Sequence, residues 1–88
     1  MIEKSFVIQN EVGLHARPAA KLTQVASNFK SEILLVKDTK TANAKSLLSV
    51  LALGIFRDAE FRIRIIGPDE LEAMCKITRL IEDDININ

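Results

Sequence analysis

The single histidine of the chain, His15, lies in the segment Gly-Leu-His-Ala-Arg-Pro-Ala-Ala of residues 13–20. Apolar residues at helical spacing follow it, so we expect His15 to stand at the start of a helix. The first N–H groups of a helix lack intrahelical acceptors, and the helix dipole places about half a positive charge there. Arg17 adds a full positive charge with several donors for a tetrahedral anion. This combination predicts a phosphate-binding site.

The imidazole of His15 supplies a nucleophile at this predicted site. The positive surroundings favour its neutral, nucleophilic form, and a nucleophile beside an anion site indicates phosphoryl transfer through a ring nitrogen. Two other interpretations remain open. His15 could simply cap the helix with Arg17 as a surface residue, or it could pair with a serine for hydrolysis, although no nucleophile-elbow motif is present. A metal site is disfavoured, because a lone histidine has no second soft ligand nearby.

Length and composition exclude several classes of protein. The chain of 88 residues fits one domain, residues 1–88, and its twelve basic and twelve acidic side chains give zero net charge. This balance argues against nucleic-acid binding, which depends on excess cationic side chains. One cysteine permits no intrachain disulfide. No apolar stretch approaches the roughly 20 residues of a membrane span, and no signal core follows the N-terminus. We therefore expect a cytoplasmic, soluble protein without direct membrane insertion.

The hydrophobic periodicity predicts seven elements in the order β-α-β-β-α-β-α. Connections of this length are typical of an α+β open-faced β-sandwich, with four mostly antiparallel strands and three helices on one face. The expected strands cover residues 2–8, 32–37, 41–44 and 60–66, and the expected helices cover residues 16–28, 47–53 and 69–81.

Cap residues mark two of the expected helix starts. Ser46 precedes the short apolar helix that stops at Gly54, as expected for an N-cap and a C-terminal glycine. Asp69 and Glu72 have the spacing of a capping box at the last helix. The tail after that helix is polar, so we expect residues 82–88 to fray.

Burial can also be predicted from the helical spacing. In the short helix we expect Val50 and Leu53 to face inward and Leu47 and Leu51 outward. We expect the last helix to have an apolar stripe, on which Cys75 is a small core residue. The residues of this stripe are Leu71, Met74, Cys75, Thr78 and Ile81. The alternating strand of residues 60–66 should place its arginines on the solvated face, and the four phenylalanines are assigned to the core.

Two segments resemble signatures of a known family. Residues 13–20 resemble the active-site signature of HPr, the histidine phosphocarrier of the bacterial phosphotransferase system. Residues 45–54, Lys-Ser-Leu-Leu-Ser-Val-Leu-Ala-Leu-Gly, resemble its second signature at the usual distance. The resemblance covers essentially the whole chain, and the family fold is the open-faced β-sandwich expected from periodicity.

The resemblance implies a role for each matching residue. His15 would accept a phosphoryl group on Nδ1 from phosphorylated enzyme I and pass it to IIA domains for sugar uptake, and Arg17 would stabilise the phosphohistidine. Ser46 matches a serine that an HPr kinase/phosphorylase modifies in many members. The protein would act as a carrier, not an enzyme, as a monomer without metal or organic cofactor. The matching docking residues are Ala16, Ala20, Leu47, Leu48 and Leu51.

One departure concerns the first helix. Many relatives carry lysines further along its exposed face, where this chain has Gln24 and Ser27, which leaves Arg17 and Lys21 as the cations of that face. Regulatory paralogues of HPr, which act in nitrogen-type phosphotransfer or bind a transcription regulator, are the alternative. The histidine at position 15 separates this chain from paralogues without the nucleophile, but not from a nitrogen-type or regulatory chain.

Overall fold

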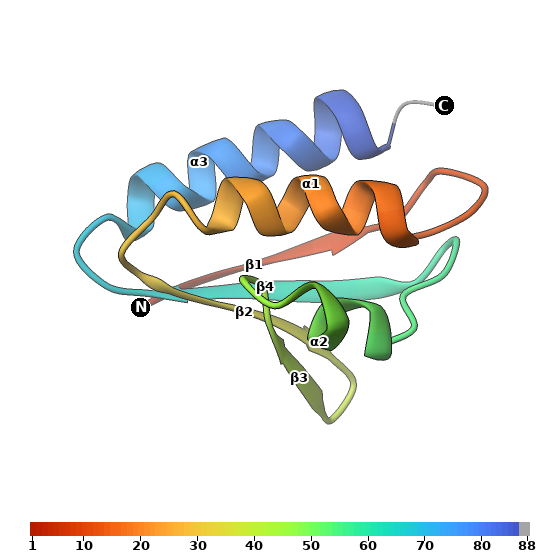
Figure 1. Ribbon diagram of the computed structural model, residues 1–88, viewed down its shortest axis with the longest axis horizontal. Coiled ribbons are helices and arrows are strands. Elements are labelled where there is room, and N and C mark those ends of the chain that lie inside the picture. Colours follow the sequence, from red (N-terminus) through yellow and green to blue (C-terminus); the bar gives the residue numbers. More distant parts are fainter. Residues whose placement is uncertain (87–88) are drawn as a thin grey trace.

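A computed structural model of the chain describes residues 1–86, and its elements follow the predicted order. The four strands form one sheet in the order β1-β4-β2-β3, with every neighbouring pair antiparallel (Figure 1). No helix within the described residues is both long and apolar enough to cross a membrane. The elements are β1 (Ile2–Val7), α1 (Ala16–Ala26), β2 (Glu32–Lys37), β3 (Lys40–Asn43), α2 (Leu47–Ala52), β4 (Glu60–Ile66), α3 (Glu70–Leu80) and the π-helical turn η1 (Ile81–Ile85).

The helices pack on one face of the sheet and leave the other face open, which confirms the predicted fold class. Helices α1 and α3 run side by side along the sheet, while α2 packs near β3 (Figure 1). In β4, Phe61 and Ile63 are buried in the core beneath the helices. Arg62 and Arg64 alternate with them on the open face, where both pair with Glu3 at 3.5 and 2.8 Å. Strand β4 therefore has the predicted half-exposed pattern.

The buried face of α3 differs from the predicted stripe. Ala73 and Ile77 are buried, whereas Leu71 and Cys75 are exposed, so the prediction of a core cysteine is wrong. Ala73 and Ile77 are four residues apart, and so are Leu71 and Cys75, so both pairs have helical spacing. Helix α3 has more apolar residues than one stripe can hold, and spacing alone therefore does not decide which pair is buried.

One of the four phenylalanines lies outside the core, contrary to prediction. Phe6 and Phe61 are buried and stacked, with ring centroids 5.8 Å apart, and Phe29 is partly buried and packs against the core. Phe56 instead follows α2 in a loop and is 70% exposed. Its neighbour Ile55 occupies the core position in that loop.

The C-terminal tail is ordered where the sequence predicts fraying. The turn η1 continues α3, and Ile85 is buried four residues after the buried Ile81. The side chain of Asn86 accepts a hydrogen bond from the N–H of Gln9 at 2.9 Å and donates one to the carbonyl of Val7 at 3.1 Å. The prediction of fraying is therefore wrong for residues 82–86, and its last two residues, 87–88, lie outside the described part of the chain.

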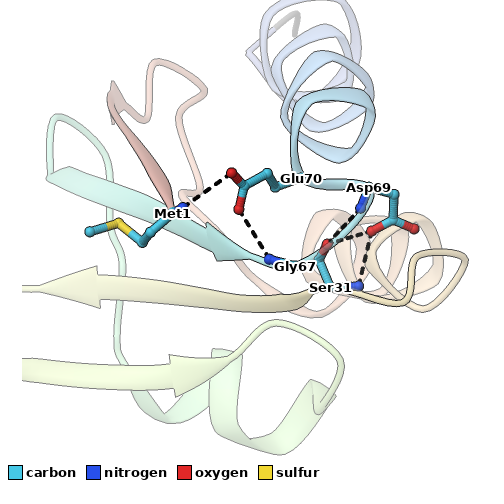
Figure 2. Close-up of polar contacts among 5 residues, drawn as sticks. All are labelled: Met1, Ser31, Gly67, Asp69 and Glu70. Atoms are coloured by element: carbon cyan, nitrogen blue, oxygen red, sulfur yellow. Dashed lines mark hydrogen bonds and ion pairs between the residues drawn. The ribbon is translucent and has the colours of Figure 1, made fainter.

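The N-terminus of α3 is held by contacts other than the predicted capping box (Figure 2). Asp69 is the N-cap residue, but its carboxylate accepts hydrogen bonds from the backbone N–H of Lys30 and from the N–H and hydroxyl of Ser31. Glu70 accepts from the N–H of Gly67 and pairs with the amino group of Met1 at 3.1 Å. The expected reciprocal bond within α3 is not made, because the Asp69 carboxylate turns toward the chain after α1.

Candidate functional site

A tight turn places His15 at the start of α1. Gly13 has φ of +73°, in the left-handed region that other residues rarely adopt. A Cβ atom at this position would lie 2.7 Å from the carbonyl oxygen of Ile55 and 2.7 Å from the Cα of Phe56. The next residue, Leu14, is buried and donates its N–H to the same Ile55 carbonyl at 2.8 Å. The loop before His15 therefore packs against the loop after α2 and is hydrogen-bonded to it.

His15 is the N-cap residue of α1, but its side chain does not cap the helix. Its backbone is extended, and its carbonyl accepts the N–H of Ala19 at 2.9 Å. The imidazole is exposed and makes no cap hydrogen bond, which removes the interpretation of His15 as a simple side-chain cap. Pro18 is buried in the first turn, where its missing N–H costs nothing. The free N–H groups of Ala16 and Arg17 remain at the helix mouth.

The His15 side chain lines a cavity of about 230 Å³ at this end of the molecule. Arg17 and Lys21 come from successive turns of α1, so two cations face the same space as the imidazole. Asp84 of η1 also lines the cavity, and its carboxylate pairs with Lys21 at 3.0 Å. Within residues 1–86, the guanidinium of Arg17 has no acidic or hydrogen-bonding partner, so it can contact an incoming anion without breaking an existing bond in this region.

Asn10 joins the wall of the cavity to the C-terminal turn. Its side chain is buried, and its Nδ2 donates to the carbonyl of Ile85 at 2.7 Å. Its Oδ1 is also buried and has no partner among the described residues. Sequence reasoning missed both Asn10 and Asp84, since their partners lie 63 to 75 residues away in the chain. The cavity lining therefore combines residues 10–21 with residues 84–85, from opposite ends of the sequence.

Comparison with known proteins identifies the family. The model of the family described as "PTS HPr component phosphorylation site" matches residues 2–83. The phosphocarrier protein HPr of Treponema pallidum (strain Nichols) is 42% identical over 83 residues, which cover 94% of each chain. The chain belongs to the HPr family.

Solved structures of HPr proteins show the same fold. A crystal structure of HPr from Thermoanaerobacter tengcongensis matches with a TM-score of 0.94 and 40% identity, covering 100% of this chain and 99% of that chain. The Bacillus subtilis protein Crh, a "catabolite repression containing protein", matches with a TM-score of 0.75 and 33% identity, covering 97% and 98% of the two chains. Members of the HPr family are phosphocarrier proteins of the phosphotransferase system, and this chain shares their whole fold.

Helix α2 brings the second HPr signature beside α1. Ser46 is its N-cap, as predicted, and its hydroxyl accepts the N–H of Ser49 at 3.4 Å. Leu47 and Leu48 are exposed, with Leu48 at 80%. Leu51 is only partly exposed and packs against the core, so the prediction that it faces outward is wrong. Val50 and Leu53 face inward as predicted.

An open hollow of about 660 Å³ connects α1 and α2. Arg17 and Ala20 line it from α1, and Leu47 lines it from α2. Ala16 is also exposed, at the start of α1. Of the residues that the resemblance assigns to docking, Ala20 and Leu47 therefore share this hollow with Arg17, whereas Leu48 and Leu51 belong to α2 but do not line it. Phe56 and Val12, which sequence reasoning did not assign to this region, are exposed on the two loops that meet at Gly13.

Proposed function

We propose that the chain is a phosphocarrier, acting as one domain over residues 1–88. It accepts a phosphoryl group on His15 from phosphorylated enzyme I and passes it to IIA domains for sugar uptake and phosphorylation. The observation that carries this proposal is the exposed imidazole at the mouth of α1. It shares a cavity with the guanidinium of Arg17, which has no partner in the described part of the chain. Membership of the HPr family supports the same role.

In the proposed step, a neutral ring nitrogen of His15 attacks the phosphorus of the donor phosphohistidine. The new N–P bond forms while the donor N–P bond breaks, and its electron pair returns to the donor nitrogen. Arg17 and the free N–H groups of the first turn of α1 hold the phosphoryl oxygens. The IIA domain takes the group by the reverse of this step. The protein is thus a substrate and relay of other transferases, not an enzyme with its own turnover.

The proposal is tested by incubating the protein with labelled phosphoenolpyruvate and enzyme I. We expect one acid-labile, base-stable phosphate in the wild type and none in His15→Ala. Because the His15 imidazole is exposed and makes no cap hydrogen bond, the variant should keep the far-UV circular dichroism and stability of the wild type. Label that persists in folded His15→Ala would contradict the assignment.

Phosphorylation of Ser46 by an HPr kinase/phosphorylase is proposed as a regulatory step. A phosphate at the N-cap of α2 is tolerated by the helix, but its charge of roughly −2 would stand beside Leu47 and Leu48 and repel an acidic partner. We expect Ser46→Asp to slow phosphoryl transfer from enzyme I several-fold. Ser46→Asn is the matched control, because it keeps a capping side chain without charge. Equal rates for the two variants would exclude the charge mechanism.

A regulatory paralogue is the second candidate function, favoured by the likeness to Crh. Such a protein would bind a transcription regulator instead of relaying phosphate. A chase experiment separates the two: a carrier loses its label to an added IIA domain, whereas a purely regulatory module does not. The monomeric state that we propose for the carrier is checked by light scattering, since a dimeric HPr structure of Thermoanaerobacter tengcongensis is also known.

A further inference from the structure

We propose that the ion pair between Lys21 and Asp84 tunes how readily His15 gives up its phosphoryl group. Lys21 stabilises the phosphorylated form, and Asp84 destabilises it. This inference rests on the proposed function and adds two residues to the same site. It also gives the C-terminal turn η1 a part in the chemistry of the carrier.

The positions of the two side chains relative to the cavity carry the proposal. Lys21 follows Arg17 by four residues on α1, so both lie on one face of the helix, and both line the cavity that His15 lines. Asp84 lines the same cavity from η1. The ammonium of Lys21 lies 3.0 and 3.2 Å from the two carboxylate oxygens of Asp84. A phosphoryl group on His15 would therefore enter a space lined by Arg17, which has no partner among residues 1–86, and by Lys21, which is paired with Asp84.

Asp84 does not depend on Lys21 to stay in place. The turn that carries it is fixed by the buried side chain of Ile85, by the Asn10 bond to the Ile85 carbonyl, and by the two Asn86 bonds to the end of β1. The Lys21 and Asp84 side chains are themselves 45% and 49% exposed, so the pair can exchange partners without disturbing the core. Loss of either charge should leave the cavity walls intact.

Charge balance fixes the direction of the two effects. In the free carrier, Lys21 and Asp84 neutralise each other. A phosphoryl group brings about two negative charges, which attract Lys21 and repel Asp84. Lys21 must then divide its interaction between the phosphoryl oxygens and the carboxylate. The fixed carboxylate keeps the phosphorylated form from becoming too stable, which suits a group that has to be passed on.

The experiment measures the equilibrium of phosphoryl exchange between phosphoenolpyruvate and the carrier, with catalytic enzyme I at low salt. We expect Lys21→Gln to lower the ratio of phosphorylated to free carrier about threefold and Asp84→Asn to raise it about threefold. The effects are of this modest size because partly exposed charges interact weakly with the phosphoryl group. The difference should shrink at high ionic strength, because salt screens interactions between exposed charges. An equilibrium measurement does not change with docking affinity, so a purely docking role would leave the ratio unchanged.

Two matched controls isolate position from net charge. Asp83→Asn changes the adjacent residue of η1, and Lys30→Gln changes an exposed lysine beyond the other end of α1, and neither residue lines the cavity. We expect both controls to keep the wild-type ratio. If the test variants match their controls, or shift the ratio in the same direction, the inference is wrong while the proposed function stands. A wild type that takes no label on His15 overturns the proposed function itself, and the inference with it.

Discussion

At the scale of single residues, the position of His15 depends on a residue without a side chain. Gly13 turns the chain in the left-handed region and lets it lie directly against the backbone of Ile55 and Phe56. Leu14 can then enter the core while His15 remains in solvent. The backbone contact between these two loops therefore fixes where the nucleophile starts, before any interaction of the imidazole itself.

Gly13→Ala should destabilise the fold more than the same change at another left-handed glycine. Gly54 has φ of +64°, but a Cβ there meets only two ring atoms of Phe56, at 3.4 and 3.7 Å. Gly54→Ala should lose about 1–2 kcal/mol from backbone conformation alone. Gly13→Ala has that cost plus a backbone clash, and it should also slow phosphorylation of His15. Urea unfolding of the two variants measures the difference, and equal losses would contradict the role given to close backbone approach.

Local signals were enough to predict His15, Arg17 and Ser46 near the starts of helices, because caps and first-turn residues act within a few positions. They could not assign the partners of Asn10 or Asp69. Asn10 bonds to a residue 75 positions away, and Asp69 bonds to residues 38 and 39 positions away. A polar residue in a loop has the same local pattern whether it meets water or a distant backbone group.

At the scale of elements, the bonds of Asp69 tie the start of α3 to the segment after α1 (Figure 2). Hydrogen bonds from the Ser31 hydroxyl, then from the Lys30 and Ser31 backbone, hold the pKa of Asp69 below its ordinary value. The Gly67 N–H, followed by the amino group of Met1, lowers the pKa of Glu70 in the same way. The ionised form of each carboxylate therefore stabilises the folded state.

This arrangement predicts how stability depends on pH. A group whose pKa is lowered by folding adds stability above its unfolded pKa, about 3.9 for aspartate, and loses it as pH falls through the folded value. Asp69→Asn should therefore be less stable than the wild type at neutral pH, and the gap should narrow as the medium becomes strongly acidic. Denaturant unfolding across that pH range measures the gap. Glu72→Gln, on the same first turn but without bonds to Ser31, should track the wild type, and a gap of constant size for Asp69→Asn would refute the linkage.

Periodicity identified every strand of the sheet and the three helices that cover it. The apolar residues recur every two positions in the strands and every three to four positions in the helices. Periodicity failed at the end of the chain for a definite reason. The acidic residues after Ile81 are typical of a frayed tail, but they all face solvent while Ile85 returns to the core. One apolar residue four positions on is too weak a signal to predict an ordered turn against such a background.

At the scale of the whole molecule, the candidate site occupies one end, where the N-terminus of α1, the turn η1 and the loop after α2 come together (Figure 1). A protein that delivers a phosphoryl group to His15 has to cover this end. A typical interface buries about 800 Å² on each partner, and the described chain exposes 5121 Å² in total. Leu48 and Phe56 are large, exposed apolar residues of α2 and the following loop, so they should fall within that area.

The ring of Phe56 lies over Gly54, at the C-terminal end of α2, and its backbone touches the turn before His15. Exposed aromatic residues at such a central position tend to dominate binding. We expect Phe56→Ala to raise the KM for phosphoryl transfer from enzyme I about tenfold, with little change in kcat or in stability. Leu71→Ala is the matched control, because Leu71 is 75% exposed on α3, near the opposite end of the fold. Steady-state transfer kinetics of the two variants decide the point: a KM that rises equally in both, or in neither, would place the docking surface away from the loop after α2.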